Sequence, residues 1–225
     1  TVFTNNATTG FFNTLSGATQ LNNAANTNQG NINIGTGSTL QVGVGDALVL
    51  NTNTSFAGSL GTFGIAGGSV DVAALVDLSA AAMVLNLNSG GLLSNAQNLT
   101  IPNTFNIGTA TLSGPGLFTT PAGSITTMDD PTITNLAWLN QGIVNWIPIN
   151  TSTSDFTLNT ATFTNQGTLL LQNLNAGSTV FTAGGGTLIN DVTGIINANP
   201  TTNLTIETVF TNNATTGFFN TLSGA

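Results

Sequence analysis

Carboxylates are the only side chains in this 225-residue chain that could do acid–base chemistry, because it contains no Lys, Arg, His, Cys or Tyr. The eight are Asp46, Asp71, Asp77, Asp129, Asp130, Asp155, Asp191 and Glu207. Asp129 and Asp130 are the only adjacent pair, and with a third acid they are the one candidate for glycoside hydrolysis, which uses two carboxylates about 5–10 Å apart. Neighbours in a strand point to opposite faces, however, and the following Pro131 favours a solvated turn. We therefore expect no catalytic residues and no enzyme.

Carboxylates could also bind calcium, because hard cations prefer oxygen ligands. The β-roll pattern Gly-Gly-x-Gly-x-Asp is absent, since Gly184-Gly185-Gly186 is followed by Thr187 and Leu188 with no Asp in register. We expect no cofactor and no metal-ligating residues, with weak calcium binding between repeats left as an alternative.

Aromatic and threonine side chains offer two binding hypotheses. Trp138 and Trp146 would lie on one side of alternating strands, where they either form an exposed sugar-stacking platform or fill the core, and we favour the core. Thr-x-Thr triplets, which are typical of some ice-binding β-solenoids, begin at Thr52, Thr109, Thr132, Thr151, Thr160 and Thr162. Only the 23-residue step from Thr109 to Thr132 matches a coil. An ice-binding solenoid remains an alternative.

The composition excludes several classes of partner. The formal net charge is −8 with no cationic side chain to contact phosphates, so we expect no nucleic-acid binding and no docking on acidic membranes. Disulfides, zinc–thiolate sites and side-chain salt bridges are excluded for the same lack of residues. No apolar run reaches the length of about 18 residues that suggests a membrane-spanning helix, so we expect no membrane insertion.

The elements that must position these residues are predicted to be strands. Thr (41), Asn (32) and Gly (27) dominate the chain and favour strands and turns over helices. Apolar residues alternate in short runs, at 39–44, 98–101, 104–108, 155–159 and 203–210. The chain contains no Asn-Gly or Asp-Gly, which disfavours tight hairpins and favours parallel strands. The Ala-rich segment 70–85 could be a helix, but its ends alternate, so we favour strand.

The two ends of the chain have the same sequence. Residues 1–18 and 208–225 both read TVFTNNATTGFFNTLSGA, which gives a 207-residue period. In one interpretation residues 1–207 form one unit of a tandem array and residues 208–225 begin the next. In the other, duplicated ends let one terminus take the place of the other in a neighbouring subunit. We favour the tandem array.

A shorter period lies inside the unit. Asn28-Gln29-Gly30, Asn140-Gln141-Gly142 and Asn165-Gln166-Gly167 each precede an apolar run, and Asn165 to Asn190 repeats the 25-residue step from Asn140. A 23-residue step separates Thr4-Asn5 from Thr27-Asn28. The prediction is an all-β parallel β-helix, or β-solenoid, of about nine coils of about 23 residues per unit, with a rise of roughly 43 Å. Asn and Thr at equivalent positions should form hydrogen-bonded ladders.

The segments Phe163–Leu169, Gly186–Asn190 and Ser113–Phe118 resemble the repeats of filamentous-haemagglutinin-like adhesins and autotransporter passenger domains. That resemblance implies a right-handed parallel β-helix acting as a rigid bacterial surface stalk. The lack of basic residues departs from those families and favours an architectural unit. We expect a structural unit of a long extracellular or cell-surface fibre whose partner is itself, end to end, with lateral bundling as an option. The alternative is an adhesin stalk presenting a carbohydrate- or protein-binding surface.

Overall fold

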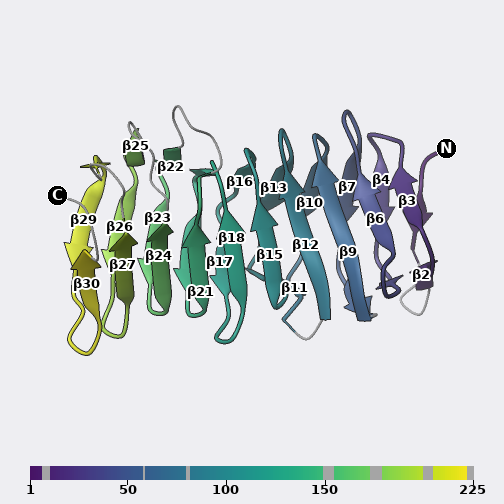
Figure 1. Cartoon of the computed structure of the whole chain (residues 1–225). Helices are drawn as coiled ribbons and strands as arrows, with labels where there is room; N and C mark the ends of the chain where they lie inside the picture. Colours follow the sequence, from purple (N-terminus) through teal and green to yellow (C-terminus); the bar gives the residue numbers. More distant parts are fainter. Residues whose placement is uncertain are drawn as a thin grey trace.

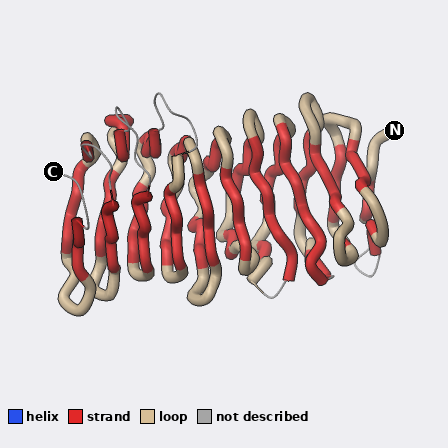
Figure 2. The backbone as a smooth tube through the Cα atoms, viewed as in Figure 1, coloured by secondary structure: helices blue, strands red, loops and turns tan. Residues whose placement is uncertain are grey.

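The computed structural model describes residues 1–6, 11–57, 59–79, 82–148, 155–172, 179–199 and 205–221, with the side chains of 59–60 and 179–183 left out. In these ranges the chain forms strands and loops and no helix (Figure 2). The strands wind into a stack of coils, with the two termini at opposite ends of the stack (Figure 1). The helical alternative for residues 70–85 is therefore wrong over the described part of that segment, as we expected.

Each coil contributes one strand to each of three faces. The first face is a ten-stranded sheet, made of β1 (Thr4–Asn5), β4 (Asn26–Asn28), β7 (Ala47–Leu50), β10 (Ser69–Val72), β13 (Leu92–Asn95), β16 (Thr111–Ser113), β19 (Thr132–Thr134), β22 (Asp155–Asn159), β25 (Thr179–Gly184) and β28 (Thr205–Ile206).

The second face consists of a three-stranded and a seven-stranded sheet. The smaller sheet contains β2 (Phe11–Thr14), β5 (Asn31–Ile34) and β8 (Ser55–Ala57). The larger contains β11 (Val76–Asp77), β14 (Leu99–Thr100), β17 (Leu117–Thr120), β20 (Ala137–Asn140), β23 (Thr162–Asn165), β26 (Thr187–Asn190) and β29 (Val209–Asn212).

The third face is again a ten-stranded sheet, and it lies at the front of Figure 1. Its strands are β3 (Ala18–Leu21), β6 (Thr39–Val42), β9 (Ser59–Ala66), β12 (Ala82–Asn88), β15 (Thr104–Ile107), β18 (Ile125–Met128), β21 (Ile143–Trp146), β24 (Thr168–Gln172), β27 (Ile195–Asn199) and β30 (Phe218–Thr221).

Strand pairing confirms the parallel β-solenoid. The ladders of all three faces are parallel, and one isolated bridge in the described ranges, Asn159 to Gly185, is antiparallel. The length of a coil varies along the stack: Ile125 pairs with Ile143 across a short coil, whereas Thr168 pairs with Ile195 across a long one. The pairings of Thr4 with Thr27 and of Asn140 with Asn165 are both as predicted.

The core runs along the axis of the stack because alternate residues of each strand point inward. In β6, for example, Leu40 and Val42 are buried while Thr39 and Gln41 are partly exposed. One part of the core is an aromatic layer, which we define as Phe105, Phe118, Trp138, Phe156 and Phe163. Trp138 lies with its ring centroid 5.2 Å from Phe118 and 5.0 Å from Phe163. Burying side chains of this size contributes about 1.5–3 kcal/mol each, so the interior holds the stack without ion pairs.

One predicted strand is divided by a corner. The alternating run at 203–210 suggested a single strand, but β28 ends at Ile206 and β29 begins at Val209. The two strands belong to different faces. Residues 203 and 204 lie outside the described ranges. Within the described ranges, no helix is present that could span a membrane.

Candidate functional site

The carboxylate pair of the enzyme hypothesis lies at a corner between β18 and β19. Asp130 accepts a hydrogen bond at Oδ1 from the backbone N–H of Asp155, with N and O 2.9 Å apart. Burial raises the pKa of Asp130 above its usual 3.8, and the neighbouring Asp129 and Asp155 carboxylates raise it further, against the lowering effect of the Asp155 hydrogen bond. The third acid near this pair is thus Asp155, and the hydrogen bond holds the start of β22 against the preceding coil.

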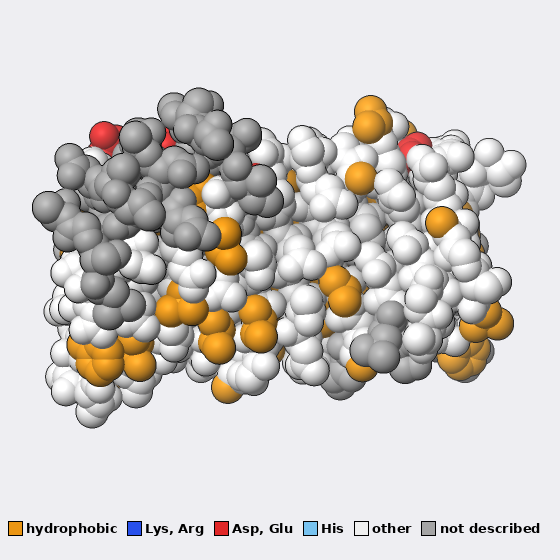
Figure 3. Space-filling view, in the orientation of Figure 1, with side chains coloured by type: hydrophobic (Ala, Val, Ile, Leu, Met, Phe, Trp, Pro, Cys, Tyr) orange, Lys and Arg blue, Asp and Glu red, His pale blue; other side chains and the backbone are white. Residues whose placement is uncertain are grey.

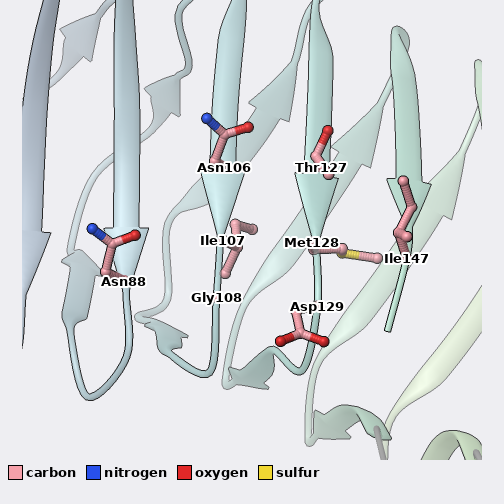
Figure 4. Close-up of a pocket in the computed structure, with 8 residues that line it drawn as sticks. All are labelled: Asn88, Asn106, Ile107, Gly108, Thr127, Met128, Asp129 and Ile147. Atoms are coloured by element: carbon pink, nitrogen blue, oxygen red, sulfur yellow. The ribbon is translucent and has the colours of Figure 1, made fainter. Parts of the chain in front are cut away.

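A surface depression of about 400 Å³ lies beside this corner, at the ends of β12, β15 and β18. Figure 4 shows Asp129 on the turn at its edge, with the apolar side chains of Met128 and Ile147 beside it. The remaining lining residues are Asn88, Asn106, Ile107, Gly108 and Thr127. Asp129 is the one carboxylate among these lining residues.

Three of the other acids make hydrogen bonds to neighbouring residues on the surface. Asp71 accepts from Ser94 Oγ at 2.8 Å, and Asp77 accepts from the backbone N–H of Ser79 at 2.9 Å. Asp191 accepts from Gln166 Nε2 at 2.9 Å, and this hydrogen bond lowers the pKa of Asp191. None of the eight acids is buried. In the described ranges, no three acidic side chains come close enough together to hold a metal ion.

The two tryptophans are buried, so the sugar-platform hypothesis is wrong. Trp138 and Trp146 are 1% and 0% exposed. Trp138 donates from Nε1 to Thr120 Oγ1 at 2.9 Å, and Trp146 donates to the backbone oxygen of Asp129 at 2.6 Å. Each indole N–H therefore has a partner inside the stack, as a buried indole requires.

The threonine triplets do not form a stacked array in the described residues. Thr111 is the residue that pairs with Thr132, so Thr109 lies out of register with Thr132 and the predicted match of these two triplets is wrong. The triplet Thr162–Thr164 pairs with Ala137–Leu139 on one side and Thr187–Ile189 on the other. Thr151–Thr153 lie outside the described residues. A flat ice-binding face needs the triplet in successive coils, which this register does not supply.

A ladder of asparagines follows one corner of the stack, where the second face meets the third. Asn140, Asn165 and Asn190 are each 0% exposed, at the ends of β20, β23 and β26. Asn140 Nδ2 donates to Asn165 Oδ1 at 2.7 Å, and Asn165 Nδ2 donates to Asn190 Oδ1 at 2.9 Å. Asn190 Nδ2 then donates to Asn212 Oδ1 at 3.0 Å. Each amide inside the ladder is satisfied by the coil before and the coil after it, which is the arrangement predicted for ladders in general.

Glycine at this corner is required by close approach of successive coils. A Cβ added to Gly167 would lie 2.1 Å from the backbone oxygen of Gly142, and a Cβ on Gly217 would lie 2.0 Å from the backbone oxygen of Gly194. The Asn-Gln-Gly motif thus combines a ladder amide with a residue that lets the next coil stack on it. The same motif at Asn28-Gln29-Gly30 marks a different corner, between the first face and the second.

The duplicated segment forms both ends of the stack and is the strongest candidate for a functional surface. Residues 1–6 and 11–18 belong to the first coil, and residues 208–221 belong to the last. Val2 and Phe11 at one end are 47% and 67% exposed, and Val209 and Phe218 at the other are 65% and 48% exposed. The strands at both ends have a coil on one side only, so each end presents unpaired backbone groups.

The side faces of the stack expose both apolar and polar side chains. On the third face Ile125, Ile143 and Phe218 point outward and are 44%, 37% and 48% exposed. They belong to one register column, which Thr168 interrupts. Figure 3 shows this face with its hydrophobic side chains separated by polar ones. The third face therefore offers a broken stripe rather than a continuous apolar patch.

Comparison with protein-family models, with curated proteins and with solved structures found no match to this chain. Membership in the adhesin or autotransporter families thus remains a prediction, while the parallel β-solenoid repeat fold itself is established by the strand pairing.

Proposed function

We propose that the chain is a structural unit of a long extracellular or cell-surface fibre, built by end-to-end continuation of the β-solenoid. One observation carries the proposal: the start of the second copy, residues 208–221, adds two further strands to the stack in parallel register. Val209–Asn212 pair with β26, and Phe218–Thr221 pair with β27. A segment identical to the beginning of the chain thus lies on its last complete coil.

The composition supports a durable structural role. Backbone hydrogen bonds between coils and a continuous apolar core supply the cohesion, and neither needs a metal, a disulfide or an ion pair. Repeat stacks of this kind gain stability from each added neighbour, so an array is more stable than its isolated unit. The lack of Lys and Arg also leaves no site for trypsin-like proteases.

The test is the assembly state of the purified 225-residue chain, followed by light scattering and electron microscopy over a range of concentrations. We expect filaments whose length grows with concentration. The variant Phe3→Asp with Phe210→Asp places a carboxylate where each end would be covered by the next unit, and it should stay monomeric. The matched control, Thr62→Asp with Thr164→Asp, adds the same charge to outward positions inside the stack and should assemble like the parent.

A parent chain that stays monomeric at every concentration would contradict the fibre proposal. Equal assembly of the Phe3→Asp, Phe210→Asp variant would show that filaments form through another surface. Circular dichroism of both variants verifies that the solenoid itself is retained.

A further inference from the structure

The two identical segments occupy different faces of the solenoid. Thr4–Asn5 lie in β1 on the first face, whereas their copies Thr211–Asn212 lie in β29 on the second face. Phe11–Thr14 form β2 on the second face, whereas Phe218–Thr221 form β30 on the third. From β1 to β29 the chain makes 28 strand steps, which is nine coils of three strands and one strand more.

The two copies of one inward asparagine make complementary halves of a hydrogen-bond ladder. Asn5 donates from Nδ2 to Asn28 Oδ1 at 2.9 Å. Its copy Asn212 accepts at Oδ1 from Asn190 Nδ2 at 3.0 Å. If one residue stood in both places, its amide would receive from the coil before it and donate to the coil after it, as Asn165 does in the middle of the ladder.

A second asparagine of the segment shows the same complementarity in the opposite direction. Asn13 accepts at Oδ1 from Asn33 Nδ2 at 3.0 Å. Its copy Asn220 donates from Nδ2 to Asn197 Oδ1 at 2.9 Å. In one copy the side-chain amide only accepts a hydrogen bond, and in the other copy it only donates one. The unused group of each copy faces the side on which a neighbouring coil would lie.

The two aromatic rings of the segment contact each other at nearly the same interplanar angle in both places. The rings of Phe3 and Phe12 have centroids 4.6 Å apart at 58°, and those of Phe210 and Phe219 have centroids 5.7 Å apart at 59°. Phe3 and Phe12 pack against the core at the first end, and Phe219 packs against it at the last end, where Phe210 is 37% exposed. The described parts of the segment thus form two strands with a contacting ring pair on either pair of faces.

We infer that consecutive units meet by superposition of these segments: residues 1–14 of a second copy take the place that residues 208–221 occupy here, and each unit is turned by one face, a third of a revolution, relative to the one before. This inference rests on the proposed fibre function and specifies its junction. In a covalent array the same residues serve as the end of one unit's stack and the start of the next.

The junction completes the asparagine ladder. With Asn5 in the place of Asn212, the relay runs from Asn140 through Asn165, Asn190 and Asn5 to Asn28, whose Nδ2 donates to Thr54 Oγ1 at 3.1 Å. The same superposition joins the two corners that carry the Asn-Gln-Gly motif into one continuous edge. Nine and one-third coils at about 4.8 Å give a rise of roughly 45 Å per unit, and three units bring the same face round again.

Separate chains can form this junction because the strands of the last coil are exposed and can be displaced. All four residues of β29 are exposed, in contrast to the alternately buried residues of β26 on which they lie. Few buried contacts hold the terminal strands, so they open at low free energy and an incoming copy of the same segment can replace them.

Disulfide trapping tests the junction in the full-length chain, which has no cysteine of its own. Ile189 pairs with Thr211, the copy of Thr4, so the inference places Ile189 of one chain beside Thr4 of the next. Neighbouring parallel strands hold such residues about 4.8 Å apart, within the reach of a disulfide. The variant Thr4→Cys with Ile189→Cys should form covalent head-to-tail oligomers under a mild oxidant, seen on non-reducing gels.

Two control pairs make the result decisive. Thr4→Cys with Thr205→Cys reports a junction without rotation, in which first faces meet, and it should remain monomeric. Ile189→Cys with Thr211→Cys should close within one chain, which verifies the register and the folding of the variants.

Oligomers from the Thr205 pair in place of the Ile189 pair would overturn the one-face rotation while leaving end-to-end assembly intact. Absence of oligomers from both pairs, with the intrachain control closed, would overturn the junction itself. Filament formation by the parent chain is scored separately, so a failed junction and a failed fibre proposal are distinguishable.

Discussion

The aromatic layer and the terminal coils are built from the same kinds of side chain but differ in how they are covered. Trp138 in the layer is 1% exposed, whereas Phe210 in the last coil is 37% exposed. Asn165 is 0% exposed with both neighbours of its ladder present, whereas its counterpart Asn212 has a coil on one side only. In a stack, the contribution of a residue therefore depends on having a coil before and a coil after it.

The largest effect is expected when the side chain at the centre of the aromatic layer is removed. Trp138→Ala should lower the free energy of unfolding by about 3–5 kcal/mol, because it leaves a cavity among Phe118, Phe156 and Phe163 and an unpaired Thr120 hydroxyl. Phe210→Ala, at an uncovered position, should lower it by much less in the dilute monomer. Urea denaturation measures the free energy of unfolding of both variants. Similar decreases for the two would contradict the idea that a residue contributes more when a coil lies on each side of it.

Breaking the ladder should have the next largest effect. Asn165→Ala leaves the buried amide N–H of Asn140 and the carbonyl of Asn190 without their ladder partner, at about 1–3 kcal/mol for unpaired buried groups. Asn212→Ala removes the same amide at an exposed position and should cost under about 1 kcal/mol. At the inferred junction Asn5 of the next unit takes the place of Asn212, so Asn5→Ala should cost as much as Asn165→Ala once units assemble, although it costs less in the monomer. A difference between Asn5→Ala and Asn165→Ala that persists in filaments would contradict the ladder junction.

A buried hydroxyl in the middle of the stack provides a test of opposite sign. Thr126 is 0% exposed between Phe105 and Val144, and its Oγ1 has no hydrogen-bond partner. Thr126→Val should stabilise the chain by about 1 kcal/mol, since it removes an unsatisfied polar atom at nearly constant shape. The outward neighbour Thr127 provides the control, because Thr127→Val changes a side chain that contacts solvent. Thermal unfolding that shows no gain for Thr126→Val would indicate a partner for the hydroxyl.

The smallest effect is expected at the Asp130 corner. The pKa of Asp130 is raised above 3.8, so the folded chain holds its proton more tightly than the unfolded chain and loses stability as the pH rises through that range. Asp130→Asn should therefore raise the melting temperature slightly at neutral pH and leave it unchanged in acid. The Asp191 pKa is lowered, so Asp191→Asn should instead remove a contribution that is present above 3.8 and lost as the pH falls. Melting curves in neutral and acidic buffer check both signs.

The sequence predicted the fold because the signals for it are local. Alternation as in Thr39–Val42, the Asn-Gln-Gly corners and the absence of Asn-Gly turns all favour parallel strands, and each holds in the structure. The faces of the duplicated segment could not be predicted, because coils differ in length and the sum of their lengths decides where Thr211 falls. The burial of Trp138 was ambiguous for a related reason: alternation places both tryptophans on one side without saying which side is the interior.

The surface position of all eight acids would give the proposed fibre the character of a polyanion. Every charged side chain has the same sign, and residues 208–225 add none, so each unit of roughly 45 Å carries eight negative groups. Like charges on neighbouring fibres repel over a screening length of about 8 Å at physiological ionic strength and over about 30 Å in dilute buffer. In the proposed fibre, salt would therefore weaken the repulsion between neighbours, whereas on assemblies held by ion pairs it weakens the attraction.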